Sequence, residues 1–257
     1  MFSFFRLFPA LDPVVIIYEI DYGKPMNNQK PKLKTTLASS GLLLPEISVL
    51  ASDSEGDATY ALLRKRVVDD NILSKPSVQS RQVIWSKIIA RYKLDIQDAL
   101  FHRWWNLIPR SESHDLAQLA VLRWAQYDLL LRFLWNEVYL LRKSMEASVQ
   151  SEDIINFIST IRGKHTGKRF FMDRSENVRV RIAQHFLLIL RECGAAKGKK
   201  NKRFVTLPIG KYASQYAAYL AKQELPGSHQ ILGHWALQWW GGNSAKADEI
   251  LRQIESY

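Results

Sequence analysis

The side chains best suited to chemistry in this sequence are the arginines, lysines and amides that crowd residues 162–203. This stretch holds 13 Lys and Arg against three Asp and Glu, so it carries +10 of the formal net charge of +11. Residues 1–161 hold 19 basic and 18 acidic side chains, and residues 204–257 hold four of each. Clustered cations neutralise phosphates and release their counterions, which scattered charges do not. The charge map predicts a nucleic-acid-binding segment, and the alternative is an ordinary solvated surface.

A helix is predicted over residues 174–193, and one of its faces carries groups that can read DNA. Asp173 stands at a capping position with Glu176 three residues later, a pattern typical of a helix N-terminus. Apolar residues at helical spacing predict the buried face: Val178, Ile182, Phe186, Ile189 and Cys193. The opposite face then carries Arg174, Asn177, Arg181 and Gln184. Arginine bonds guanine or phosphate, and Asn and Gln pair with adenine, so this face is predicted to contact a major groove.

Further cations lie on both sides of this helix. A helix predicted over 151–163 leads into a basic turn that contains Lys164, Lys168 and Arg169. After the long helix, a Gly-containing loop carries five cations, and Phe204 to Thr206 predict a short strand that ends before Pro208. The order of helix, turn, helix and hairpin predicts a winged helix, with the loop as a wing across the phosphate backbone; the alternative is a disordered basic loop. The five loop cations are Lys197, Lys199, Lys200, Lys202 and Arg203.

Residue patterns for catalysis, metal binding or a cofactor are missing from the sequence. It has no Gly-rich phosphate loop, no H-E-x-x-H and no G-x-S-x-G. The six histidines are dispersed, and His229 and His234 are five residues apart, so they do not share one face of a helix. The single cysteine, Cys193, falls on the apolar face and can form no intramolecular disulfide. We therefore expect a cytoplasmic protein without enzymatic activity, metal or cofactor.

The remaining sequence predicts an all-α fold with two helical lobes, winged-helix and helix-turn-helix-like elements, and one short β-hairpin wing. The helices predicted over 57–69 and 77–93 have helix-turn-helix order, with Ser77 as N-cap and Lys87 on the outward face as a further DNA contact. Plain packing in a bundle is the alternative. The other helices are predicted over 45–52, 95–108, 113–125 and 127–145.

Apolar segments of the chain are predicted to be core rather than membrane spans. The stretch 116–141 contains Arg123, Asp128, Arg132 and Glu137, and Pro and acidic residues interrupt the apolar N-terminus. The pairs Trp104-Trp105 and Trp239-Trp240 are predicted to pack in the core, with stacking on unpaired bases as the alternative. The predicted division is an extension (1–30), a helical domain with the helix-turn-helix-like unit (31–147), a winged-helix-like basic domain (148–222) and a helical tail (223–257).

The chain resembles the BrxA family over about residues 35–222. The resemblance begins with TTLASSGLLLPE at 35–46, VVDDNIL at 67–73, and SRQVIWSKIIARY at 80–92, which includes Arg81 and Arg91. It continues through 178–194 and the basic loop up to Leu207-Pro208-Ile209. Residues 1–25 and the Trp-rich tail after Pro226 lie outside the resemblance.

The resemblance implies helical lobes, winged-helix-like elements and DNA binding in bacteriophage exclusion (BREX) defence systems. Other members of these systems include a methyltransferase, an ATPase and a phosphatase-like protein. We therefore expect a non-catalytic accessory protein that binds double-stranded DNA, with other BREX proteins as further partners and no membrane association. Two alternatives stay open: an RNA-binding factor comparable to the NusB-like antitermination proteins, and a protein-interaction subunit. The oligomeric state does not follow from the sequence.

Overall fold

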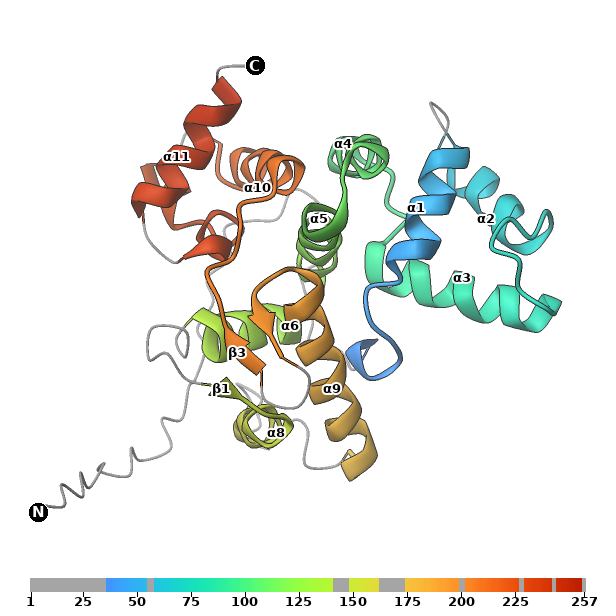
Figure 1. Cartoon of the computed structure of the whole chain (residues 1–257). Coiled ribbons are helices and arrows are strands. Elements are labelled where there is room, and N and C mark those ends of the chain that lie inside the picture. Colours follow the sequence, from blue (N-terminus) through green and yellow to red (C-terminus); the bar gives the residue numbers. More distant parts are fainter. Residues whose placement is uncertain are drawn as a thin grey trace, which may run out of the picture.

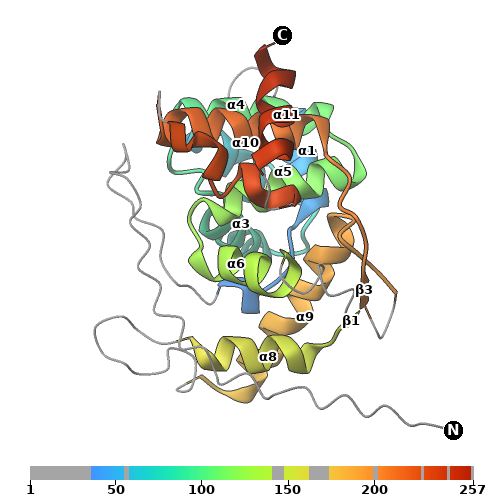
Figure 2. The ribbon, with the colours of Figure 1, turned by 90° about the vertical axis from the view of Figure 1, so that its left-hand side faces the viewer.

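The computed structural model describes residues 36–54, 58–140, 148–161, 174–198, 202–226, 229–241 and 244–255. These residues form a mostly helical protein with a small antiparallel sheet of three short strands, which confirms the predicted fold class. Figures 1 and 2 show α8, α9 and the sheet at one end of the molecule, with α4, α10 and α11 at the other. No helix in the described ranges is long and apolar enough to cross a membrane.

The N-terminal elements surround a buried central helix. They are η1 (Thr36–Ala38), α1 (Leu44–Asp53), α2 (Tyr60–Val68), α3 (Val78–Tyr92), α4 (Ala99–Leu107), η2 (Ile108–Arg110) and α5 (Ser113–Ala125). The N-cap hydroxyl of Ser77 accepts from the amide of Ser80, as predicted for the start of α3. Every residue of α5 from Leu116 to Ala125 is buried, which fits a helix that is apolar almost all round. Helix α5 therefore forms the centre of the core (Figure 1).

The second apolar segment continues the core. Helix α6 (Leu129–Phe133) runs directly into the π-helical segment η3 (Leu134–Leu140), so the predicted helix is confirmed as far as Leu140, and residues 141–145 lie outside the described part. Both tryptophan pairs are buried, with Trp104 and Trp240 fully excluded from solvent. The prediction of core packing for these pairs is confirmed, and their rings are not available to stack on bases.

The basic part of the chain forms a helix pair and the sheet. Its elements are β1 (Ser148–Val149), α8 (Ser151–Thr160), α9 (Glu176–Glu192), β2 (Ala196–Lys197) and β3 (Lys202–Phe204). Strand β3 lies between β1 and β2 and is antiparallel to both. The hairpin strand starts two residues earlier than predicted, because Gly198, with φ 106°, already turns the chain after β2.

Helix α9 begins later than the sequence indicated. Ser175 has extended backbone angles, φ −57° and ψ 151°, and its side chain makes no capping hydrogen bond. The helix therefore starts at Glu176, and the prediction of a start at Arg174 is wrong by two residues. Asp173, the predicted cap, lies outside the described residues.

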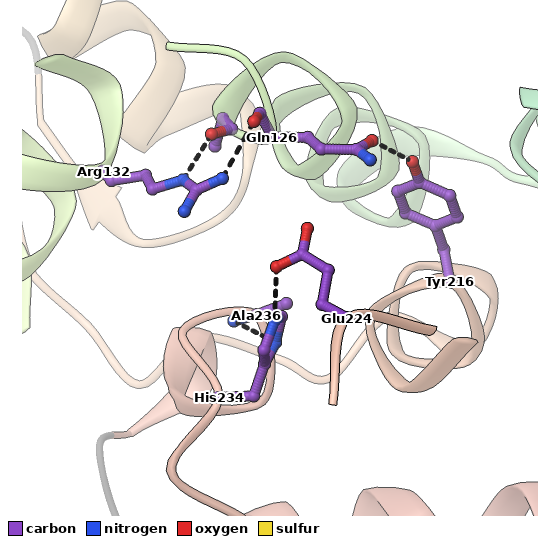
Figure 3. A network of polar contacts seen from close by, with 7 residues as sticks. Gln126, Arg132, Tyr216, Glu224, His234 and Ala236 are labelled. Carbon is purple, nitrogen blue, oxygen red and sulfur yellow. Dashed lines mark hydrogen bonds and ion pairs between the residues drawn. The ribbon is translucent and has the colours of Figure 1, made fainter. Parts of the chain in front are cut away.

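The C-terminal elements are attached to α5. They are α10 (Lys211–Glu224), η4 (His229–Gly233), η5 (Leu237–Trp240) and α11 (Ser244–Glu255). Gln118 on α5 joins them: its Nε2 donates to the carbonyls of Cys193 (3.0 Å) and Pro208 (2.9 Å), and its Oε1 accepts from Gly210 N and Trp240 Nε1, both at 3.0 Å. Figure 3 shows a second junction, where His234 meets Glu224 near Arg132. The predicted division into domains stays a prediction.

Candidate nucleic-acid interface

Three of the four side chains that the sequence singled out lie on the outward face of α9, and the fourth, Arg174, directly precedes the helix. Arg174, Asn177, Arg181 and Gln184 are all exposed. On the opposite side, Ile182, Phe186, Ile189 and Cys193 are fully buried, while Val178 is partly buried. The predicted apolar face is thus confirmed, and so is the polar face for Asn177, Arg181 and Gln184, whereas Arg174 lies before the first turn of the helix. One arginine and two amides stand in one exposed row on the first turns of the helix, and the exposed Arg174 precedes them.

The open part of this face has a defined length. Its next turn is covered by η1 and the segment that follows it, because the His185 Nδ1 atom lies 2.6 Å from the carbonyl oxygen of Leu37 in η1. A Cβ placed on Gly41 would lie 3.1 Å from Leu188 Cδ2, which shows how closely this segment crosses the helix. The eight residue steps from Glu176 to Gln184 span ~12 Å at about 1.5 Å each. That length is about the width of the major groove of B-DNA.

The hairpin beyond α9 places two cations directly opposite each other. Lys197 on β2 pairs with Arg203 on β3, and both side chains are exposed. Like charges at opposing positions of an antiparallel pair destabilise it, on the order of 0.2–1 kcal/mol. A bound polyanion reverses that cost, because it neutralises both charges.

Lys202 departs from the predicted wing surface. It pairs with Val149 of β1, and alternation along β3 turns its side chain inward while Arg203 points outward. The residue is only 7% exposed, and its Nζ donates to the carbonyl of Gly198 at 2.8 Å. Desolvation, and then the charge of Arg191, lower the pKa of Lys202. The expectation that Lys202 lies on the outer surface of the hairpin is therefore corrected.

Arg191 is a cation of this region that the sequence reasoning missed. It is exposed and lies seven residues after Gln184, so it continues the outward row of α9 beyond Leu188. Its effect on the pKa of Lys202 places it near the hairpin. The spacing of three and four residues from Asn177 through Arg181, Gln184 and Leu188 contained the signal that could have found it.

Several predicted contacts lie outside the described residues: Lys164, Lys168, Arg169, Lys199 and Lys200. Lys87 is described, and it lies half-buried on the outward side of α3. Together with Gln79 and Val83 it lines two shallow hollows of about 350 Å³ and 420 Å³. Lys87 is far along the chain from the α9 face, and its role stays a prediction.

The thiol nearest this interface is a buried one. Cys193 is fully buried, and burial raises the pKa of its thiol well above the ordinary value. Within the described ranges, no group of three or more His, Cys, Asp or Glu side chains is arranged to hold a metal ion.

Fold and site together define a helical protein with a basic helix face and a basic hairpin side by side. The chain belongs to the BrxA family, whose model matches residues 31–219, and it is therefore a protein associated with BREX defence systems. Its fold is similar to that of an uncharacterised protein from Magnetospirillum magneticum known from a crystal structure. The TM-score is 0.59 and the identity 17%, over 76% of this chain and 96% of that chain. No curated protein matches the sequence.

Proposed function

We propose that this protein is a non-catalytic accessory subunit that binds double-stranded DNA in its BREX system. In this proposal the first turns of α9 enter a major groove, and the β2–β3 hairpin contacts the adjacent phosphate backbone. The observation that carries it is the exposed row of Asn177, Arg181 and Gln184 over a groove-sized length of helix, with the exposed Arg174 directly before the first turn.

The hairpin supports the same proposal independently. Lys197 and Arg203 face each other on exposed positions of a two- and three-residue strand pair. An arrangement that costs stability in the free protein is favoured where both cations meet a common anion, and duplex DNA carries one negative charge per ~1.7 Å of helix axis. The strand order β1-β3-β2 beside α8 and α9 supports a winged-helix mode of binding.

The burial of the two tryptophan pairs favours duplex DNA over single strands. Single-strand binding uses exposed aromatic rings as stacking platforms, and the two tryptophan pairs are in the core. A-form RNA has a narrow major groove that side chains do not read, so the α9 face suits RNA less well. These points support duplex DNA as the partner and make RNA an outcome of the test.

The test is fluorescence anisotropy with duplex DNA, single-stranded DNA and RNA of equal length, titrated between about 50 and 200 mM salt. We expect the tightest binding to duplex DNA, with a steep salt dependence. The double variant R174Q/R181Q should bind duplex DNA about tenfold more weakly or worse, because it removes two cations from the groove face.

The matched control is R103Q/R252Q, which neutralises two exposed arginines on α4 and α11, at the end of the molecule away from α8 and α9 in Figure 1. It changes the net charge by the same amount and should bind nearly as the unaltered chain does. Equal losses of DNA affinity in both variants would show that the loss depends on the net charge of the protein and not on the α9 face. Tighter binding to RNA, or no binding to any polymer at low salt, would contradict the proposal and favour an RNA-binding or a protein-docking role respectively.

A further inference from the structure

We propose that α9 reads base sequence, and that its first turns select duplex DNA in which two A·T pairs lie about three base pairs apart with a G·C pair between them. The inference rests on the proposed function, because it assigns separate roles to side chains of the same helix face. It follows from the identity and spacing of the residues on that face, and from the segment that ends it.

The first turns of α9 present four residues on one face, because they stand at positions i, i+3, i+4 and i+7: Asn177, Val180, Arg181 and Gln184. The three polar side chains are exposed. Within the described part of the chain, none of the three has a hydrogen bond or an ion pair with another residue. Their donors and acceptors are therefore available to bond the edges of bases.

Val180 adds an apolar contact to this polar face. It is partly exposed, and among the described residues it does not belong to the core, whereas Val178 on the same helix packs against the core. In the major groove an A·T pair presents the thymine methyl group together with the adenine N6 and N7 atoms that an amide bonds. A valine that stands between two amides therefore suits the same A·T pairs that the amides select.

The geometry of the helix sets the distance between the bases that are read. Asn177 and Gln184 are seven residues apart, which is ~10.5 Å along the axis at about 1.5 Å per residue. Successive base pairs lie about 3.4 Å apart, so a helix that follows the groove places the two amides about three base pairs apart. Arg181 lies ~6 Å beyond Asn177, about two base pairs on, where a guanidinium bonds guanine O6 and N7. The expected order is A·T, any pair, G·C, A·T.

A fixed segment of the chain ends the reading face directly after Gln184. His185 Nδ1 lies 2.6 Å from the carbonyl oxygen of Leu37, and Arg91 Nη2 donates to the carbonyl of Ser40 at 2.8 Å. The segment 36–42 is thus held by both α9 and α3, and in Figure 1 the blue chain of η1 lies close to α9. DNA on this face cannot extend past the segment, which limits base reading to the first turns of the helix.

The experiment first selects duplexes from a random library with the full chain, and then measures their affinities by anisotropy at ~150 mM salt, where phosphate contacts contribute less. We expect the selected duplexes to share two A·T pairs three base pairs apart, with a G·C pair between them. Replacing either A·T pair by G·C should lower the affinity about 5- to 150-fold, the range for one bidentate base contact.

Two variants assign the contacts to single residues. N177A should lose the preference for A·T at one end of the site, and Q184A should lose it at the other end, because each removes one amide. Neither variant changes the net charge, so both should keep the salt slope of the unaltered chain and its affinity for a duplex that lacks the site. The matched control N106A removes an exposed amide on α4 and should leave the preference unchanged.

Three results would overturn the base-reading role. They are selected duplexes without a common pattern, a preference that N177A and Q184A leave unchanged, and variants that lose the same affinity for every duplex, as a purely structural role requires. In each case a loss of binding in R174Q/R181Q still upholds the proposed function. An unaltered chain that fails to bind any duplex DNA overturns both.

Discussion

Buried arginines show at the residue level that a count of charges overstates what the surface offers. Arg91, Arg123 and Arg132 lie in the core, and each donates to backbone carbonyls. Each guanidinium also lies over an aromatic ring, as Arg132 does over Trp235 at 3.9 Å. These three cations stabilise the fold and do not contribute charge to the surface. The surface formed by the chain before α8 is therefore less basic than its residue counts indicate, and it differs more strongly from the basic surface around α9.

A second residue-level feature is the contact between His234 and Glu224, shown in Figure 3. His234 Nε2 lies 2.8 Å from Glu224 Oε2, and the amide of Ala236 donates to His234 Nδ1 at 3.3 Å. The second contact makes Nδ1 an acceptor, so Nε2 carries the proton that is donated to the carboxylate. Burial raises the pKa of Glu224, but the hydrogen bond from His234 and the charge of Arg132 lower it overall.

This lowered pKa predicts a pH-dependent contribution to stability. A carboxyl group with a lower pKa in the folded state stabilises the fold above its unfolded pKa of about 4.3, and the contribution is lost as pH falls through the folded pKa. At neutral pH, E224Q should lower the free energy of unfolding by about 1 kcal/mol. Urea unfolding at several pH values between about 3 and 7 measures this.

The control for this prediction is E152Q, which changes an exposed glutamate on α8 and should leave stability within about 0.5 kcal/mol. The difference between the unaltered chain and E224Q should shrink as pH falls from about 4.3 through the lower folded-state pKa, because below that second value Glu224 is protonated in both folded and unfolded states. A difference that stays constant down to pH 3 would show that E224Q acts through packing and not through charge.

A single substitution in the β2–β3 hairpin should change the stability of the protein and its affinity for DNA in opposite directions. Replacing Arg203 by Gln removes the repulsion across the strand pair from Lys197. The free protein should become slightly more stable at low salt, by about 0.2–1 kcal/mol, and this gain should disappear at high salt. The same variant should bind duplex DNA more weakly, because one phosphate contact is lost.

Thermal unfolding at two salt concentrations, together with the anisotropy titration, measures both quantities in one variant. A loss of stability above 1 kcal/mol in R203Q would mean that Arg203 holds the hairpin together. S148A, at the position opposite Arg203 on β1, is a control that leaves the charge pair intact. If its binding equals that of the unaltered chain while R203Q is impaired, the effect belongs to the charge of Arg203.

Helices and faces could be predicted from the sequence because they depend on local spacing. The apolar rows of α3 and α9 and the cap at Ser77 follow directly from residues three and four positions apart. Long-range contacts could not be predicted in this way. The inward turn of Lys202 depends on its pairing with Val149, more than 50 residues earlier, and the cover over Leu188 depends on Gly41. The location of the candidate site could therefore be predicted from the charge composition of the sequence. Which of its residues are exposed could be seen only in the structure.

For the whole molecule, the C-terminal segment is part of the core although the family match ends at residue 219. Trp239 stacks on Trp135 with ring centres 4.1 Å apart, and Trp135 Nε1 donates to the Trp239 carbonyl at 3.0 Å. Trp240 reaches Gln118, which also holds the carbonyls of Cys193 and Pro208 on both sides of the hairpin. The segment thus stabilises α5 and, through α5, the chain around the hairpin.

This arrangement predicts that the C-terminal segment sets stability without taking part in DNA binding. W239A should lower the free energy of unfolding by about 3–5 kcal/mol, because it opens a cavity beside Trp135. Well below its unfolding temperature, the variant should bind duplex DNA with the same affinity and salt slope as the unaltered chain, since Trp239 packs on Trp135 and Trp235 and not on the exposed row of α9. Urea unfolding and anisotropy measure the two effects.

Replacing Trp235, which is only half-buried on the same segment, should lower the free energy of unfolding by less than W239A does. If W239A lost DNA affinity while it was still folded, the two ends of the molecule would be coupled, and the buried path through Gln118 would be where to seek that coupling.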